Sequence, residues 1–226
     1  MLTFYLKRIC YRMKKLAIYG AGGFGKEVFC IVRKINETKP QWDVVGFFDD
    51  GRAKGCAVGR YGHVLGGMNE LNAWNEELAI VVAVGATKNL LRIVSRINNP
   101  RVWFPNIIHP DAIFADWQSI TMGQGNVVQR ASAFSCDVTI GDFNVFNGST
   151  VVGHDVTIGN HNIFMPSVRL SGGVKIGDDN FFGIASIVIQ GLKVGFDVTL
   201  SAGSVLLTKP KDGFLYLGNP ARKTEF

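Results

Sequence analysis

The pattern of apolar and polar positions changes near residue 106. Before that point, continuous apolar stretches alternate with segments whose apolar residues recur at helical spacing. The apolar stretches predict strands at residues 15–20, 42–50 and 78–85, and the helical spacing predicts helices at 26–37 and 89–99. Strands without polar alternation are buried on both faces, and strands that alternate with helices form parallel sheets. We therefore expect a parallel α/β domain over residues 13–105.

The remainder, residues 106–226, follows a strict repeat of 18 residues and ends in a C-terminal tail. Segments 120–128, 138–146, 156–164, 174–182 and 192–200 align without a gap, and each contains a glycine at the same place: Gly123, Gly141, Gly159, Gly177 and Gly195. Five copies without an insertion indicate a solenoid, in which each coil is buried only by its neighbours.

The repeat also predicts the cross-section of the solenoid. Six residues suffice for one short strand and a bend, so three hexapeptides close a triangular coil. The first and fifth positions of a hexapeptide point inward, and the fifth positions form a column of asparagines: Asn126, Asn144, Asn162 and Asn180. Stacked amides can hydrogen-bond along such a column. Before residue 120 the apolar register shifts by two residues, so we expect an irregular first coil.

Composition and charge exclude several classes of protein. The net charge is +6, but Lys7, Arg8, Arg12, Lys14 and Lys15 supply +5 of it, so the rest of the chain offers no basic surface to nucleic acid. Residues 1–12 read as an extension ahead of a natural start at Met13. No apolar stretch is long enough to span a membrane. The four scattered cysteines are typical of reduced thiols, so we expect a cytoplasmic protein.

Several short sequences together carry a family resemblance. The chain resembles the bacterial hexapeptide-repeat acyltransferases, and among them the sugar O- or N-acetyltransferases similar to NeuD and PglD. The resemblance covers residues 13–223 and rests on "GAGGFGKEV" (20–28), "GFFDD" (46–50), "AVG" (83–85), "IIHPDA" (107–112), "VVGHDVTIG" (151–159), "LSGGVKIG" (170–177) and "LGNPAR" (217–222). It implies a Rossmann-like domain before a left-handed parallel β-helix, a homotrimer, and acetyl-CoA as co-substrate.

A glycine-rich segment lies between the first predicted strand and the first predicted helix. Its glycines are Gly20, Gly22, Gly23 and Gly25. Taken alone, the spacing GxGxxG predicts a phosphate-binding loop for a dinucleotide such as NAD, with Asp49 or Asp50 at the ribose. A tight turn without a ligand is the alternative.

The family resemblance implies a different ligand for the same loop. In relatives the glycine-rich loop, the acidic pair Asp49–Asp50 and the glycine matching Gly85 hold a nucleotide-sugar, usually UDP-linked. Many relatives carry histidine where this chain has Phe24, and Asn-Asn where Ala86 and Thr87 follow Gly85. These departures leave the sugar and its nucleotide open.

His154 is the main catalytic candidate. It occupies an outward position of its hexapeptide, so it is either a polar corner residue or a general base, because imidazole titrates near neutrality. The resemblance implies the second role, with Asp155 as its carboxylate partner, although Asp155 could equally cap the corner. The resemblance also matches Asn147 to an acceptor-site residue, with a plain turn asparagine as the alternative. A metal shared by His154 and His161 would need a third histidine at suitable spacing, so we expect none.

The resemblance places the acetyl-CoA site on the later coils. It matches Gly172 to a glycine whose backbone N–H points at the thioester oxygen, with Gly173 beside it. A turn glycine is the alternative. Lys209 and Arg222, with Lys211 and Lys223 as further candidates, would meet the phosphates of coenzyme A, unless they form a solvated basic tail.

These observations predict an acetyl-CoA-dependent acetyltransferase that acts on a sugar by direct attack, without an enzyme nucleophile. The expected acceptor is a nucleotide-linked amino sugar of the kind used for surface glycans. The alternatives are O-acetylation of a free sugar such as a sialic acid, and a non-catalytic β-helix scaffold. We expect a homotrimer with small-molecule substrates and no nucleic-acid partner.

Overall fold

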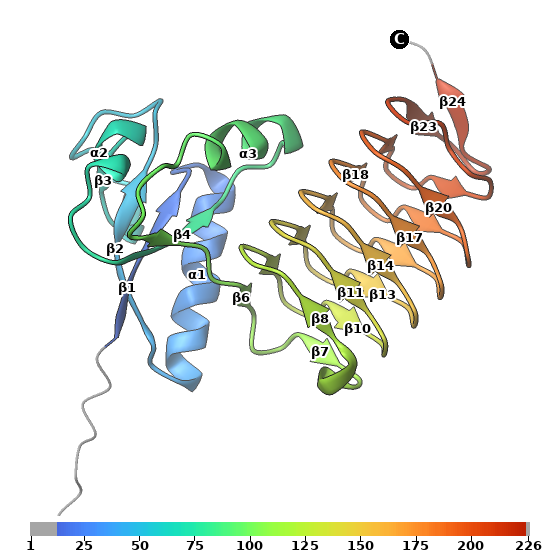
Figure 1. Ribbon diagram of the computed structural model, residues 1–226, viewed down its shortest axis with the longest axis horizontal. Helices are drawn as coiled ribbons and strands as arrows, with labels where there is room; N and C mark the ends of the chain where they lie inside the picture. The colour runs from blue at the N-terminus through green and yellow to red at the C-terminus, as the bar shows by residue number, and fades with distance from the viewer. Residues whose placement is uncertain (1–12, 225–226) are drawn as a thin grey trace, which may run out of the picture.

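The structure, a computed structural model, describes residues 13–224 as two parts that lie side by side (Figure 1). The proposed extension at 1–12 lies outside these residues. The N-terminal part is a parallel sheet in the order β3-β2-β1-β4-β5. Its elements are β1 (Lys14–Tyr19), α1 (Gly23–Thr38), β2 (Trp42–Phe48), a 3-10 turn (Gly59–Tyr61), β3 (Val64–Gly66), α2 (Met68–Asn72), β4 (Leu78–Val82), α3 (Thr87–Val94) and β5 (Val102–Trp103).

Helices cover both faces of this sheet. Alternate residues of β1 point to opposite sides: Leu16 and Ile18 pack with α1, whereas Ala17 and Tyr19 pack with α2 and α3. Continuous burial is the reason that β1 reads as an uninterrupted apolar stretch. The strand order reverses between β1 and β4, and ligands bind outside the carboxyl ends of the strands at such a switch point.

The second part is a β-helix of three parallel sheets. Its strands are β6 (Ile107–Ile108), β7 (Ile113–Phe114), β8 (Thr121–Met122), β9 (Val127–Val128), β10 (Ala133–Phe134), β11 (Thr139–Ile140), β12 (Val145–Phe146), β13 (Val151–Val152), β14 (Thr157–Ile158), β15 (Ile163–Phe164), β16 (Arg169–Leu170), β17 (Lys175–Ile176), β18 (Phe181–Phe182), β19 (Ile187–Val188), β20 (Lys193–Val194), β21 (Thr199–Leu200), β22 (Val205–Leu206), β23 (Leu215–Leu217) and β24 (Arg222–Thr224). This is the predicted fold class.

The three sheets form the three faces of a prism. The docked face is the one on which the N-terminal part packs, and it contains β6, β9, β12, β15, β18 and β21. Its outward residues Ile107 and Val127 share a buried cluster with α1. The apolar face runs from β7 to β22, and the polar face from β8 to β20. We call the corner between the docked and apolar faces the near edge. The corner between the apolar and polar faces is the far edge, opposite the docked face.

The coils stack in the predicted register. Thr139 pairs with Thr157 and Val145 with Ile163, each 18 residues on. The first coil is irregular, as expected: Ile107 pairs with Val127, whereas Thr121 pairs with Thr139. The two additional residues lie between β7 and β8, where a 3-10 turn (Trp117–Ser119) widens the coil.

The predicted asparagine column is present and fully hydrogen-bonded. Asn162 is wholly buried; its Nδ2 donates to Asn144 Oδ1 at 3.0 Å and to the Gly177 carbonyl at 2.8 Å. Its Oδ1 accepts from the backbone N–H and the amide of Asn180, each at 2.9 Å. Each amide therefore satisfies polar groups of two neighbouring coils that no water can reach.

Three short elements were not predicted, and several predicted boundaries differ from the structure by two to five residues. β3, α2 and β5 were not predicted, because two to five residues are too few to show a period. The helix expected over 89–99 covers only Thr87–Val94. It ends early because the following residues bind α2: Asn98 N–H donates to Asn72, and the Asn99 amide donates to the Leu71 and Trp74 carbonyls.

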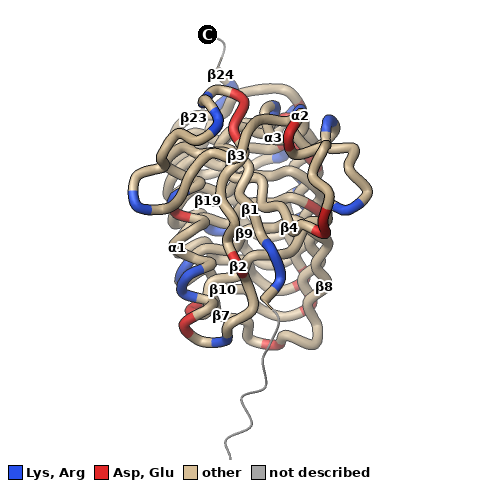
Figure 2. Tube along the Cα trace, turned by 90° about the vertical axis from the view of Figure 1, so that its left-hand side faces the viewer, with Lys and Arg blue, Asp and Glu red and all other residues tan. Residues whose placement is uncertain are grey.

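On the side shown in Figure 2, basic and acidic positions are interspersed. Among residues 13–224, no helix combines the length and the apolar character needed to cross a membrane.

Replacing Asn162 tests the column. Asn162→Ala removes the donor to Gly177 and the acceptor of the Asn180 N–H, and leaving two buried backbone groups unpaired should cost about 2–5 kcal/mol of unfolding free energy. Urea unfolding measures the loss. The matched control is Asn69→Ala at an exposed position of α2, which should change stability by less than about 0.5 kcal/mol. Equal stability of the two variants would contradict a structural role for the column.

Candidate active site

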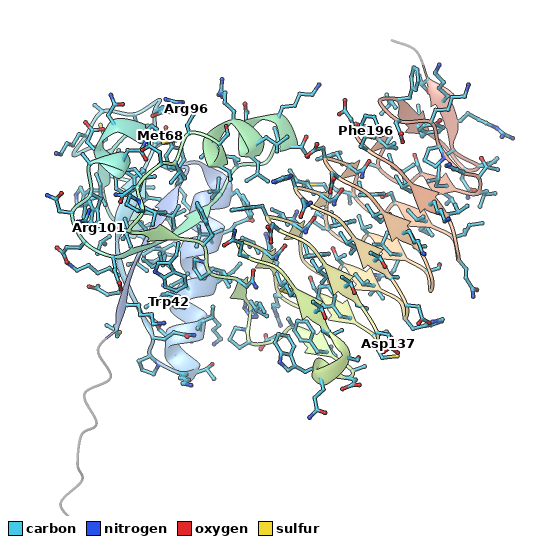
Figure 3. All side chains as sticks on the ribbon, viewed as in Figure 1. Trp42, Met68, Arg96, Arg101, Asp137 and Phe196 are labelled. Atoms are coloured by element: carbon cyan, nitrogen blue, oxygen red, sulfur yellow. The ribbon has the colours of Figure 1, made fainter. Side chains whose placement is uncertain are left out.

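The far edge brings the catalytic candidates into one column. Corners 18 residues apart are joined by backbone hydrogen bonds, from Asp155 N–H to Cys136 O at 3.1 Å and from Gly173 N–H to His154 O at 2.8 Å. His154 therefore lies directly below Gly172. Figure 3 labels Asp137, one coil before Asp155, on the side of the β-helix turned away from the N-terminal part.

His154 and Asp155 form an exposed pair. Nδ1 of His154 lies 2.6 Å from Oδ2 of Asp155, and more than half of each side chain is accessible. Asp155 has a φ of 57°, the left-handed conformation that short polar residues tolerate at a turn. Asp155 thus occupies the corner, and its carboxylate binds the imidazole.

Gly172 lies against the imidazole ring. A Cβ at position 172 would collide with Nε2, Cε1 and Cδ2 of His154, so only glycine leaves room for the ring there. The Gly172 N–H has no acceptor within residues 13–224, whereas Gly173 N–H is bound to His154 O. One unused backbone donor therefore lies next to a histidine whose Nδ1 is engaged.

The far edge continues to Lys209. Lys209 lies three residues after β22, as Asp155 lies three residues after β13, although the coil after β22 is two residues shorter than the others, since Thr199 pairs with Leu215. At a strand spacing of about 4.8 Å, three coils place the two positions roughly 14 Å apart. Arg222 lies instead on β24, which pairs with β23 in the docked-face sheet, and Lys223 lies over the ring of Phe214. Of the basic candidates discussed here, Lys209 is thus the one on the histidine edge.

The glycine-rich loop divides into packing and open positions. A Cβ at Gly20 would clash with Ala83 O, and one at Gly25 with Gly20 O, so these two allow close packing of the loop. A Cβ at Gly22, Gly23 or Gly85 would meet nothing within 4 Å. The three open glycines lie at the carboxyl ends of β1 and β4, at the switch point. The first turn of α1 contains no acidic residue, so its free N–H groups can donate hydrogen bonds to a bound anion.

The carboxylates of Asp49 and Asp50 both bind other groups of the protein. Asp49 accepts from the N–H groups of Ala21 and Gly51, each at 2.8 Å, so it fixes the glycine-rich loop. Asp50 accepts from Met68 N–H at 2.8 Å and pairs with Arg96 at 3.2 Å. Burial raises the pKa of Asp50, but the Met68 hydrogen bond and the Arg96 charge outweigh it, and the pKa lies below its ordinary value.

A cavity of about 410 Å³ lies between the switch point and the β-helix. The N-terminal part contributes Gly23, Phe24, Glu27, Val84 and Gly85; the β-helix contributes Gln129, Val145, Asn147, Ile163, Met165, Pro166 and Phe181. Asn147 lies on the near edge, where its Nδ2 donates to Phe164 O at 2.9 Å and its Oδ1 accepts from Gln129 at 2.8 Å. The cavity brings together Asn147 and two of the three open glycines, Gly23 and Gly85.

The cavity and His154 do not meet within one chain. Asn147 lies on the near edge, whereas His154 lies on the far edge, with the strand β13 between them. The docked face, which carries the N-terminal part, is opposite the far edge. The candidate residues therefore form two groups on different sides of the chain.

His161 belongs to neither group. It lies at the third corner, stacked on Phe143 with ring centroids 5.9 Å apart and with Nδ1 3.3 Å from Asp179. In residues 13–224, no three His, Cys, Asp or Glu side chains are arranged to hold a metal ion.

Comparison with known proteins gives the family. Residues 15–97 match the PglD N-terminal domain. The acetyltransferase domain of PglB from Neisseria gonorrhoeae FA1090, solved with acetyl coenzyme A, is 31% identical with a TM-score of 0.83, over 94% of this chain and 100% of that one. The chain belongs to the PglD-like hexapeptide-repeat sugar acetyltransferases.

Two further relatives have the same architecture. PerB from Caulobacter crescentus, solved with CoA and GDP-perosamine, is 28% identical with a TM-score of 0.84, over 93% of this chain and 97% of that one. WeeI from Acinetobacter baumannii AYE is 23% identical with a TM-score of 0.82, over 94% of this chain and 100% of that one, and shows the fold. The curated protein sequences give no match.

Two polar residues that line the cavity of this acetyltransferase were not candidates from the sequence. Glu27 lies inside the glycine-rich sequence but is not a glycine. Gln129 lies 18 residues before Asn147, so the repeat register could have placed it beside that candidate. What the register could not reveal is the approach of α1, which brings Glu27 within hydrogen-bond distance of Gln129.

Gly172→Ala tests the contact between Gly172 and the imidazole. The added methyl group would push the ring away from its position beside Asp155, and a displacement of about 1 Å can cost roughly 10²-fold in kcat. The control is Gly203→Ala on the near edge, where a Cβ meets nothing within 4 Å. Its φ of 65° is left-handed, but Ala185 adopts a φ of 55° at the same corner one coil earlier, so alanine is tolerated there. An alanine variant at 172 with the turnover of the control would show that the ring does not need this glycine.

Proposed function

We propose that this protein transfers the acetyl group of acetyl-CoA to the amino group of a nucleotide-linked sugar, with His154 as general base. The observation that carries the proposal is the exposed His154–Asp155 pair, 2.6 Å apart, seated against Gly172. The ligands of the relatives support the substrate classes, since PglB was solved with acetyl coenzyme A and PerB with GDP-perosamine.

His154 moves the proton. Asp155 accepts the Nδ1–H, so Nε2 is the unprotonated nitrogen that takes a proton from the attacking amine. The amine nitrogen bonds to the acetyl carbon, the carbon–sulfur bond breaks, and His154 returns the proton to the thiolate of the leaving coenzyme. Direct attack needs no serine or cysteine nucleophile.

The rest of the far edge would hold the acetyl donor. The free N–H of Gly172 would bind the thioester oxygen as it gains negative charge, with Gly173 beside it. Gly191, one coil further along the edge, leaves open space where a Cβ would stand. The ammonium group of Lys209 would meet the coenzyme phosphates.

The N-terminal part would hold the acceptor. The open positions Gly22, Gly23 and Gly85 let a diphosphate approach the backbone, and the N-terminus of α1 favours its negative charge. The sugar would extend into the cavity beside Asn147. Asp49 and Asp50 would act mainly by fixing the loops around the nucleotide.

Because the cavity and His154 lie on different sides of one chain, we propose a homotrimer in which each site combines two protomers. The cavity of one protomer would face the far edge of its neighbour. The apolar face supports this assembly, since Ile113, Val151, Ile187 and Val205 point outward from it. We expect the enzyme to work in the cytoplasm, since Cys30, Cys56 and Cys136 are free thiols, as in reducing compartments.

An acceptor panel tests the function. The purified protein is incubated with acetyl-CoA and with GDP-perosamine, UDP-linked 4-amino sugars or N-acetylneuraminic acid, and acetylated products are identified by mass spectrometry. We expect transfer to a nucleotide-linked amino sugar. Transfer to the free sialic acid alone, or to no acceptor, would contradict the proposal.

His154→Ala tests the catalytic role. Loss of a positioned base typically lowers kcat about 10²- to 10⁴-fold. Because His154 is exposed, its removal should leave the melting temperature and the acetyl-CoA affinity unchanged. A variant that turns over at the wild-type rate would make His154 a corner residue, and His161 would then be tested.

A further inference from the structure

Three side chains form a continuous hydrogen-bond chain along the wall of the cavity. Gln129 Nε2 donates to Asn147 Oδ1 at 2.8 Å and to Glu27 Oε2 at 3.1 Å, and Asn147 Nδ2 donates to Phe164 O at 2.9 Å. The chain thus runs from a backbone carbonyl of the β-helix to a carboxylate on α1. It crosses the junction between the two parts of the protein.

The contacts fix the orientation of both amides. The Phe164 carbonyl can only accept, so the amino group of Asn147 faces it and Asn147 Oδ1 faces Gln129. Gln129 must then present its amino group to both Asn147 and Glu27, which accounts for both of its N–H groups. Gln129 Oε1 and Glu27 Oε1 remain, and neither has a hydrogen-bond partner in residues 13–224.

The unused groups at this end of the cavity are therefore acceptors. A carboxylate and an amide oxygen bind hydroxyl or ammonium groups and repel other carboxylates. The remaining wall is largely apolar, with Phe24, Ile163 and Phe181. A neutral or cationic sugar ring fits this chemistry, whereas a ring that carries a carboxylate does not.

In residues 13–224, no ion pair joins Glu27 to a neighbouring cation. Lys26, Lys34 and Arg130 line a second cavity, to which Glu27 and Gln129 also contribute. Lys34 is paired with Glu37 at 2.8 Å, and Arg130 with Asp111 at 3.3 Å. Lys26 is not among the residues that line the cavity with Asn147.

We propose that Glu27, oriented by Gln129, determines acceptor specificity by binding hydroxyl or ammonium groups of the sugar and excluding sugars that carry a carboxylate. The inference rests on the proposed function, because it assigns a role within the acceptor site. The inference also distinguishes the two acceptor classes that the sequence suggested. The ring of a sialic acid carries a carboxylate, whereas the expected nucleotide-linked amino sugar carries none.

Glu27→Gln tests the inference, because it keeps the shape and removes the charge. The variant loses a hydrogen bond between the sugar and a charged group, so the acceptor binds more weakly. The acceptor KM should rise, and kcat/KM for GDP-perosamine or a UDP-linked 4-amino sugar should fall about 10- to 100-fold. The KM of acetyl-CoA should not change, and N-acetylneuraminic acid should inhibit the variant more strongly than the wild type. The matched control is Glu37→Gln, at the other end of α1, with no effect on either substrate.

The outcomes distinguish this inference from the proposed function. A wild-type protein that acetylates an amino sugar, with an acceptor KM and a sialic-acid inhibition that Glu27→Gln leaves unchanged, would overturn the role of Glu27 alone. A wild-type protein that acetylates no acceptor would overturn the proposed function, and this inference with it. A Glu27→Gln variant with the wild-type melting temperature and a raised acceptor KM supports the inference, because a purely structural role would shift the melting temperature.

Discussion

The stacking of one coil on the next, in steps of 18 residues, is the constraint on which the rest of the structure depends. The buried asparagines keep it in register: each amide binds the coil before it and the coil after it, so a slip of one residue would leave buried polar groups unpaired. The stacked rings of Phe146, Phe164 and Phe182, with centroids 4.9 Å apart, follow the same spacing. Residues 18 apart in the sequence therefore lie one above another along an edge of the prism.

The functional geometry follows from this register. His154 and Gly172 are one coil apart and therefore touch, and Lys209 shares their edge three coils later. Asn147 and Gln129 are also one coil apart, but on the near edge. A difference of seven residues between Asn147 and His154 places a whole face of the prism between them. The β-helix thus keeps the two groups of candidate residues on different edges, which is why the proposed chemistry requires a second protomer.

Much of this was predictable from the sequence, because the repeat is strictly periodic. Inward positions, the asparagine column and the irregular first coil all follow from counting residues. The parallel sheet followed from uninterrupted apolar strands such as β1. By contrast, β3, α2 and β5 are held by tertiary contacts such as the Asn99 amide, which leave no period in the sequence.

The site was predictable only in part. The family resemblance proposed His154, Gly172 and Asn147 as site residues. The sequence could not show that Asp49 is engaged by the glycine-rich loop, nor that Arg222 lies off the histidine edge. Glu27 was not a candidate, because its place in the cavity depends on how α1 packs against the β-helix. Contacts between the two parts of the chain are set by surface shape, which no local pattern encodes.

Subunit complementation tests the shared active site most directly. His154→Ala chains keep an intact acceptor cavity, and Gly22→Val chains keep an intact far edge while a larger side chain fills the open loop. Each variant alone should be inactive. In randomly mixed trimers, about a quarter of the sites would pair a sound cavity with a sound histidine, so roughly that share of wild-type activity should return. Hybrid trimers with no more activity than their parents would contradict a site built from two protomers.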